Sequence, residues 1–150
     1  MTRINLIDPR NLADQHTMVE WREIKMVPAA LRRSLRTRKI SDILANVPAR
    51  YTLNTGHVTF FYPRMKFLTA RYKLLTDELL TRNYDIGDKS GDFTPFLHNL
   101  PDVFNNTEWC PDKDEIAINV ERILLRLSEK PLFYKYYGKP LDINSYITTL

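Results

Sequence analysis

Cysteine, glycine and histidine are scarce in this 150-residue sequence, which contains one Cys, four Gly and three His. The single cysteine, Cys110, cannot form an internal disulfide. Three scattered histidines and one cysteine argue against a tetrahedral zinc site. The chain also has no glycine-rich phosphate loop, CxxC pair, HExxH motif or GxSxG motif. We therefore expect no metal and no nucleotide cofactor.

Long hydrophobic runs are also missing. No apolar stretch approaches the roughly 18 to 20 residues that a bilayer-spanning helix needs, so we expect no association with a membrane. The first ten residues carry Arg3, Asp8 and Arg10 and have no apolar core of the kind found in a secretory signal. Together with the lone cysteine, this favours the reducing environment of the cytoplasm.

Positive charge is concentrated near the start of the chain. The net charge is +4, and residues 1–39 contain nine Lys or Arg against four Asp or Glu. Five of the nine fall in RRSLRTRK, residues 32–39. Such a cluster attracts polyanions, of which nucleic acid is the commonest, but it is equally consistent with a solvated helix face.

Apolar periodicity predicts three main helices. Asp8-Pro9 is a plausible helix entry, and the first helix should run to about Arg38 with a kink or break between Ile24 and Pro28. The second should open at Pro63, because the apolar residues that follow repeat with 3-4 spacing: Met65, Leu68, Tyr72, Leu75 and Leu79. The third should open at Pro111-Asp112 and end before Pro131, with a similar repeat: Ile116, Val120, Ile123, Leu124 and Leu127.

The intervening segments predict loops. Residues 51–63, YTLNTGHVTFFYP, have some β character but no partner strand, so we expect a packed loop. Residues 85–106 are rich in Gly, Asp, Asn and Pro and should be irregular. The length is typical of one domain, so we expect an all-α fold: a compact single domain (residues 1–150) of three main helices with long connecting loops.

Two segments could carry chemistry. FYKYYGK, residues 133–139, interleaves four aromatic residues with two lysines, and could stack on bases while pairing with phosphates. It could equally be core-packing aromatic sequence. In ADQHTMVEWRE, residues 13–23, His16 and Glu23 are seven residues apart and fall on nearly the same helix face. Taken alone, Glu23 reads as an ordinary solvated charge.

Five ordered blocks resemble one family. MTRINL, LADQH, WRE, GHVTFFY and YKYYGK occur in this order in the pyrimidine-dimer DNA glycosylase/AP lyases, which this chain closely resembles over most of residues 1–61 and 116–139. The resemblance implies a DNA repair enzyme that excises cyclobutane pyrimidine dimers from double-stranded DNA and then cleaves the abasic strand by β-elimination. It also implies a monomer, with no cofactor, in the cytoplasm of a bacterial or phage-infected cell.

The resemblance assigns roles to individual residues. Thr2, exposed as the first residue once Met1 is removed, should attack C1′ with its α-amine, and Glu23 should be the catalytic carboxylate. An α-amine has a pKa of about 7.7 to 8.0 against about 10.4 for lysine, so far more of it is unprotonated at pH 7. The positions implied to contact DNA or to line the site are Arg3, Gln15, His16, Arg22, Lys25, Arg122, Arg126, Phe133, Tyr134, Lys135, Tyr136, Tyr137, Gly138 and Lys139.

The chain departs from the family pattern at several positions. Phe133 and Met26 stand where the best-known family member carries tryptophan and arginine, and residues 140–150 form a C-terminal extension. Ring-opened purines and bare abasic sites therefore remain open as substrates. A helical DNA-binding module that senses bent DNA without cutting it, and a helical protein whose basic patch meets an acidic partner, are the alternatives.

Overall fold

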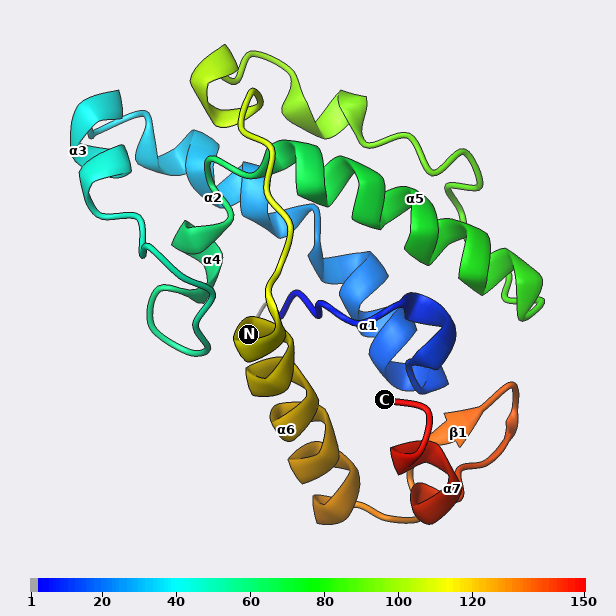
Figure 1. Ribbon diagram of the computed structural model, residues 1–150. Helices are drawn as coiled ribbons and strands as arrows, with labels where there is room; N and C mark the ends of the chain where they lie inside the picture. The colour runs from blue at the N-terminus through cyan, green and yellow to red at the C-terminus, as the bar shows by residue number, and fades with distance from the viewer. Residues whose placement is uncertain (1–2) are drawn as a thin grey trace.

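The computed structural model describes residues 3–150, and it is predominantly helical (Figure 1). Four α-helices hold most of the fold: α1 (Asp14–Glu23), α2 (Met26–Ser34), α5 (Met65–Thr81) and α6 (Lys113–Glu129). Shorter elements connect them: η1 (Pro9–Asn11), α3 (Ile40–Ala45), α4 (His57–Phe60), η2 (Thr94–Leu97), η3 (Asp102–Phe104), β1 (Lys135–Tyr136), β2 (Lys139–Pro140) and α7 (Ile143–Ile147). The all-α class is confirmed, since β1 and β2 form only a two-stranded hairpin.

The predicted first helix is broken where expected. Helix α1 ends at Glu23 and α2 begins at Met26, and Pro28 sits in the first turn of α2. A proline is tolerated there because backbone N–H groups of the first turn have no intrahelical acceptor. The predicted entry at Pro9 was wrong: Asp8 caps only the 3-10 turn η1, and the chain is extended at Leu12 before α1 begins.

The other two predicted helices form as α5 and α6. Helix α5 packs against α1, where Trp21 stacks on Tyr72 at 6.1 Å and donates a 3.0 Å hydrogen bond from its indole nitrogen to Thr76. Helix α6 begins with a capping box, in which Asp112 and Glu115 accept from each other's backbone N–H groups at 2.9 and 3.2 Å. Both helices start within two residues of their predicted prolines.

The segment between α3 and α5 is more ordered than a loop. It contains the one-turn helix α4, which begins after Gly56 in the left-handed conformation (φ 90°). A Cβ at Gly56 would lie 3.0 Å from a side-chain carbon of Pro48, so only glycine fits well. Tyr51, Phe60 and Phe61 are buried in edge-to-face contacts in the same segment.

One continuous apolar core extends from Ile4 near the start to Tyr146 in α7 and includes residues of α1, α2, α5 and α6. The five periodic residues predicted for the second helix are all buried in it. None of the helices between residues 3 and 150 has the length and apolar character needed to cross a membrane. The core therefore serves to fix the N-terminal segment, α1 and α6 around a shared site.

Candidate active site

The backbone of the N-terminal segment is held by side chains from elsewhere in the fold. The Ile4 N–H donates to His57 Nε2 at 2.8 Å, and the Ile4 carbonyl accepts from the Tyr51 hydroxyl at 2.9 Å. Two residues on, the Leu6 N–H donates to the side-chain oxygen of Asn119 at 2.7 Å. This segment is not a loose tail, because three buried side chains fix its position and register.

The side chain of Asn5 extends the same fixation inward. It donates to Glu20 at 2.9 Å and accepts from Asn119 at 2.8 Å. Glu20 also receives two hydrogen bonds from Arg71, at 2.7 and 3.0 Å, and Arg71 donates to the Ile7 carbonyl at 2.5 Å. Glu20 and Arg71 are 1% and 4% exposed, so removing either one would leave the other charge buried without its partner.

Arg3 is the first residue that the structure describes, and it lies among like charges. Burial, followed by the charges of Arg122 and Arg126, lowers the pKa of the Arg3 guanidinium, while the charge of Glu23 opposes this shift. Three arginines converging in this way repel one another and attract an anion such as a phosphate. Thr2, the predicted nucleophile, lies outside the described residues.

Two adjoining hollows open beside Arg3. The smaller has a volume of about 260 Å³ and lies between α1 and α6; the larger has about 490 Å³ and extends to the aromatic block. Both are lined by Arg3, His16, Val19 and Arg126. The smaller hollow is also lined by Arg122 and Glu20. The larger hollow is also lined by five residues that were predicted to belong to the site: Gln15, Arg22, Phe133, Tyr134 and Lys135.

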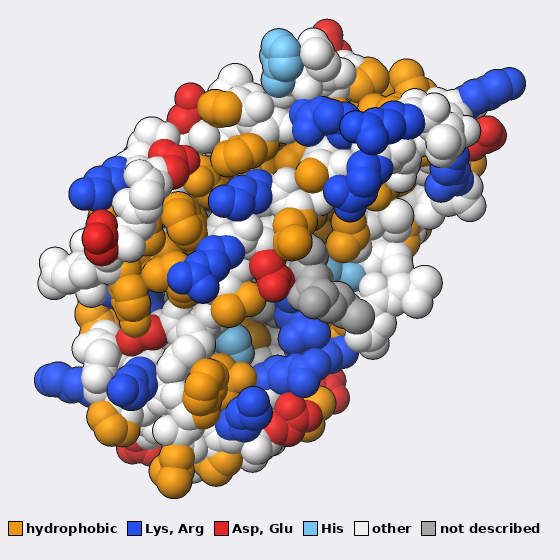
Figure 2. All heavy atoms as spheres, turned by 180° about the vertical axis from the view of Figure 1, so that it is seen from behind, with side chains coloured by type: hydrophobic (Ala, Val, Ile, Leu, Met, Phe, Trp, Pro, Cys, Tyr) orange, Lys and Arg blue, Asp and Glu red, His pale blue; other side chains and the backbone are white. Residues whose placement is uncertain are grey.

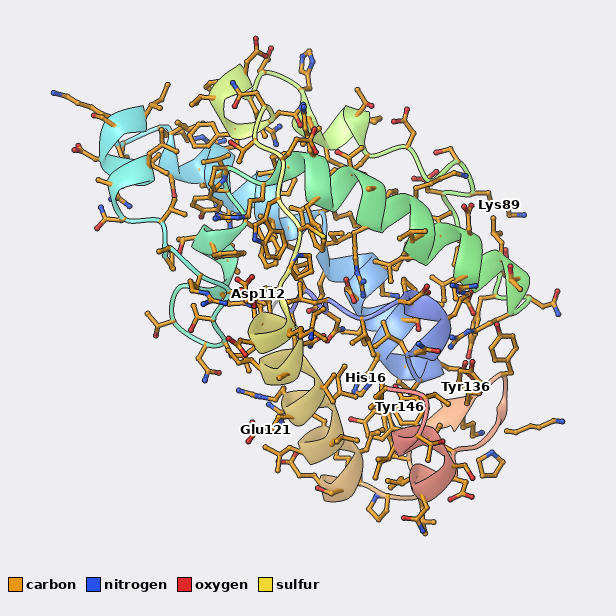
Figure 3. All side chains as sticks on the ribbon, in the orientation of Figure 1. His16, Lys89, Asp112, Glu121, Tyr136 and Tyr146 are labelled. Atoms are coloured by element: carbon orange, nitrogen blue, oxygen red, sulfur yellow. The ribbon has the colours of Figure 1, made fainter. Side chains whose placement is uncertain are left out.

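His16 lies where the two hollows meet, in the space between α1 and α6 (Figure 3). Its ring packs on Tyr134 at 4.7 Å, and its Nδ1 is buried with no hydrogen-bond partner among residues 3–150. Burial, helped by the charges of Arg3 and Arg126, lowers the pKa of His16 to about 4. The imidazole is therefore neutral at pH 7, and the positive charge of the site comes from the arginines.

Glu23 ends α1, next to the exposed Arg22. The carboxylate oxygen Oε2 of Glu23 is buried but has no hydrogen-bond partner within residues 3–150. Buried polar atoms are normally paired, and an unpaired one asks for an explanation. The charge of Glu23 acts on Arg3, but the Glu23 side chain lines neither of the two hollows.

The aromatic block divides into two parts with different contacts. Its first part, Phe133 to Lys135, is tied to α1 by Gln15, whose amide donates to the Phe133 carbonyl at 2.8 Å and accepts from the Lys135 N–H at 3.0 Å. Phe133 remains 52% exposed at the edge of the larger hollow. Gln15 therefore contributes to the site by positioning an exposed aromatic ring.

The second part turns back as the β1–β2 hairpin, in which Tyr136 pairs with Lys139. Tyr137 and Gly138 have φ values of 52° and 76°, as the two central residues of a type I′ turn require. Both of their N–H groups donate to the Asp14 carboxylate, at 3.0 and 2.8 Å. The sequence reading missed this hairpin.

The buried guanidinium of Arg82 lies beneath the hairpin and contacts both of its tyrosines. It lies 5.0 and 4.6 Å from the ring centres of Tyr136 and Tyr137, and pairs with Asp14 and Glu78 at 2.9 Å each. The hydroxyl of Tyr137 also donates to Glu78, at 2.6 Å. These two tyrosines are thus anchored to the fold.

The remaining predicted DNA contacts differ in setting. Arg122 and Arg126 lie one turn apart on α6 and make single contacts at their exposed edges, to Asn54 and Glu129, at 3.2 Å each. Lys25 lines neither hollow, and its ammonium group lies 5.6 Å from the ring centre of Trp21. The structure therefore brings both α6 arginines to the site and leaves Lys25 outside its lining.

Sequence reasoning did not identify the residues that hold the N-terminal segment: His57, Tyr51 and Asn119. A usable signal existed for one of them, because His57 stands in the GHVTFFY block that carried the family resemblance. Nothing in the local sequence of Asn119 or Tyr51 indicates a partner more than forty residues away, since their contacts are created by the tertiary fold.

A hollow lined by arginines, with an exposed aromatic ring at its edge, is typical of a helical nucleic-acid-binding protein, since phosphates require the cations and unstacked bases the aromatic rings. A family model described as pyrimidine dimer DNA glycosylase matches residues 1–90. The chain therefore belongs to the pyrimidine dimer DNA glycosylase family, whose substrate is DNA and whose role is DNA repair.

Proposed function

We propose that this protein is a bifunctional enzyme, which removes cyclobutane pyrimidine dimers from duplex DNA and then cuts the abasic strand as a lyase. One observation carries the proposal: Ile4 is clamped into the core by His57 and Tyr51, while Glu23, whose charge acts on Arg3, has a buried Oε2 atom with no hydrogen-bond partner within residues 3–150. A DNA-binding module without catalysis has no need to fix its first residues in this way. An enzyme whose nucleophile is the chain terminus does.

The nucleophile in this proposal is the α-amine of Thr2, freed by removal of Met1. At pH 7 roughly 15% of an α-amine is unprotonated, against less than ~0.1% of a lysine side chain. Thr2 is bonded to Arg3, so the hydrogen bonds that hold Ile4 also limit how far the amine can be from the site. The terminal amine then needs no buried lysine to react at neutral pH.

Each step of the proposed reaction uses the α-amine of Thr2, the carboxylate of Glu23 or water. The amine forms a bond to C1′ as the bond from C1′ to the damaged base breaks, and opening of the sugar ring gives a Schiff base. Loss of a proton from C2′ then expels the 3′ phosphate by β-elimination, and water releases the enzyme. Glu23 stabilises the positive charge that develops on the sugar and carries the protons between steps.

Recognition in this proposal relies on shape. A photodimer weakens stacking and pairing, so the duplex bends and a base leaves the stack at lower cost there than at intact sequence. Arg3, Arg122 and Arg126 would hold the phosphates of the bent strand around the smaller hollow. Phe133 would stack on an exposed base face, because half of its surface is open at the rim of the larger hollow.

Borohydride trapping tests the proposal, because it reduces a Schiff base to a stable bond between protein and DNA. Wild-type protein lacking Met1 should be trapped on a duplex that contains a thymine dimer. Glu23→Gln should bind this duplex with near wild-type affinity and fail to cut it, since only the charge is removed. The matched control is Glu121→Gln on the solvent side of α6 (Figure 3), which should cut normally.

The results separate the alternatives. Absence of a trapped adduct on both dimer and abasic DNA, with removal of Met1 verified by intact mass, would contradict the proposal and favour a binding module. Efficient cutting by Glu23→Gln would leave the amine in place but remove Glu23 from the mechanism.

A further inference from the structure

Three consecutive apolar side chains are exposed where the chain leaves α6. Pro131, Leu132 and Phe133 all face solvent, and Leu132 is 96% exposed, the largest fraction among the exposed large hydrophobic side chains of residues 3–150. We call these three residues the PLF tip. A single exposed leucine needs no explanation, but a run of three exposed apolar residues is unfavourable in water unless it serves a function. The PLF tip is therefore a candidate contact surface.

The backbone around Leu132 is held in place. A turn encloses this residue, in which the Phe133 N–H donates to the Lys130 carbonyl at 3.1 Å. The Phe133 carbonyl accepts from the Gln15 amide at 2.8 Å, and the ring of Pro131 restricts the backbone before Leu132. The PLF tip is thus exposed but preorganised, and little backbone entropy is lost when Leu132 enters a partner.

Basic side chains border the PLF tip. The ammonium group of Lys130 lies 5.4 Å from the Phe133 ring centre, and Arg22 and Lys135 line the larger hollow together with Phe133. No ion pair within residues 3–150 includes Arg22, Lys130 or Lys135. Hydrophobic and basic side chains lie side by side at the lower end of the molecule in Figure 2, which is the end where α6 runs toward the hairpin in Figure 1. An apolar tip bordered by cations suits a duplex, because phosphates flank the apolar faces of the bases.

The spacing of the PLF tip matches the spacing of stacked bases. Phe133 lines the larger hollow, whereas Leu132 lies one residue outside its lining. Consecutive Cα atoms are about 3.8 Å apart, close to the rise of about 3.4 Å between stacked base pairs. When Phe133 stacks on one base, Leu132 is therefore within reach of the adjoining base step. Proteins that kink DNA insert apolar side chains such as leucine between base steps.

We propose that Leu132 is a wedge, which enters the duplex at the lesion and occupies the gap that forms where a base leaves the stack. The wedge excludes water from this gap and opposes the return of the base. Inserting it costs less at a lesion, where stacking is already weak, than at intact sequence, so Leu132 favours damaged DNA over intact DNA. The inference deepens the proposed function and rests on it, because it assigns a specificity-determining residue to the same lesion site.

The test compares three variants of Leu132 with a matched control. Leu132→Ala shortens the wedge, Leu132→Met keeps an apolar side chain of similar volume, and Leu132→Asn keeps the size but makes the side chain polar. The control is Leu74→Ala on α5, since Leu74 is 53% exposed and lines neither hollow beside Arg3. Because both leucines are exposed, all four variants should unfold at the wild-type urea concentration.

Binding is measured at one fixed salt concentration on two duplexes of the same sequence, one intact and one containing a tetrahydrofuran abasic-site analogue. Leu132→Ala and Leu132→Asn should bind the abasic duplex about 5- to 10-fold more weakly than wild type, and the intact duplex within about 2-fold of wild type. Leu132→Met should stay within about 3-fold of wild type on both duplexes. Leu74→Ala should bind both duplexes as wild type does.

A fluorescent base reports the wedge more directly. The adenine analogue aminopurine, placed opposite the tetrahydrofuran site, becomes brighter when it leaves the stack, and the increase is read at saturating protein. If the wedge favours the extruded base about 10-fold, an extruded fraction of about 90% in wild type becomes about 50% in Leu132→Ala. Leu74→Ala should give the full wild-type increase.

Wild-type affinity of Leu132→Ala for the abasic duplex would overturn the inference. An equal loss on the intact duplex would also overturn it, since Leu132 would then make a general contact with DNA. So would a full aminopurine signal in Leu132→Ala, because another group would then hold the base out of the stack. Neither assay needs a bond to C1′, so both remain informative when borohydride traps nothing. Normal trapping combined with wild-type binding by Leu132→Ala would remove the wedge and leave the proposed function intact.

Discussion

His57 is the best single position at which to test how the N-terminal segment is held. Its Nδ1–H donates to the Thr52 carbonyl at 2.8 Å, and its Nε2 accepts from the Ile4 N–H at 2.8 Å. The substitution His57→Phe keeps a ring of similar size in a site that is 2% exposed. It removes both hydrogen bonds.

The expected loss of stability follows from the two groups left unpaired. A buried N–H or carbonyl without a partner costs about 1 to 3 kcal/mol, and Thr52 is only partly buried, so we expect about 2 to 4 kcal/mol in total. The ring contacts of His57 with Tyr51 and Phe61, at 5.4 and 5.5 Å, should survive in the variant. The loss should therefore come from hydrogen bonding and not from a cavity.

Activity should fall further than stability predicts. A displacement of a reacting group by about 1 Å can cost roughly 100-fold in rate, and Ile4 is two residues from the proposed nucleophile. Urea unfolding gives the free energy of unfolding. Single-turnover borohydride trapping gives the reaction rate, measured without urea at a temperature at which the variant is fully folded. Tyr51→Phe, which removes only the hydroxyl bond to the Ile4 carbonyl, should produce a milder form of both effects.

The exposed His98 supplies the control, since His98→Phe should change neither quantity. The reasoning would be refuted if the His57→Phe variant unfolded at the same urea concentration as wild type and formed the trapped DNA adduct at the same rate. The hydrogen bonds to Ile4 would then have no positioning role.

Further predictions concern the hairpin, the aromatic edge and pH. Arg82→Met should destabilise the protein by about 3 to 5 kcal/mol in urea unfolding, because Asp14 and Glu78 would be left buried without their cation; a loss below 1 kcal/mol would contradict this. Phe133→Ala should weaken binding to dimer DNA by about 1 to 3 kcal/mol while changing unfolding by less than about 0.5 kcal/mol, and equal losses in the two assays would show a structural role instead. Because burial lowers the pKa of His16 to about 4, its neutral form is favoured in the fold, so stability should be fully present above about pH 6.5 and fall by up to about 3 kcal/mol as the pH drops toward 4. The variant His16→Gln should unfold with a flatter pH dependence, and an unchanged dependence would assign the effect to other groups.

Local sequence was sufficient to predict the helices because their signals are local. The 3-4 repeat from Met65 to Leu79 and the Asp112 cap act within one or two turns, and the structure confirms both helices. The break before Pro28 follows from proline chemistry alone. The entry at Pro9 failed because the same Asp-Pro signal also caps a single 3-10 turn.

The site was predictable only as far as the family resemblance reached. It selected residues such as Arg3, His16 and Arg126, which the structure brings to the same hollows. It did not reveal the contact of Arg82 with Asp14, that of Tyr137 with Glu78 or the His57 acceptor, because these contacts join residues 53 or more positions apart. Whether Thr2 and Glu23 perform the chemistry remains a prediction.

The central claim is that the chain terminus is the nucleophile, and peptide mapping of the trapped adduct tests it most directly. Protein of verified intact mass, lacking Met1, is reduced with borohydride on a thymine-dimer duplex and then digested. The account predicts that the DNA remnant is attached to the α-amine of the peptide that begins at Thr2. An adduct on a lysine side chain, or no adduct at all, would contradict it.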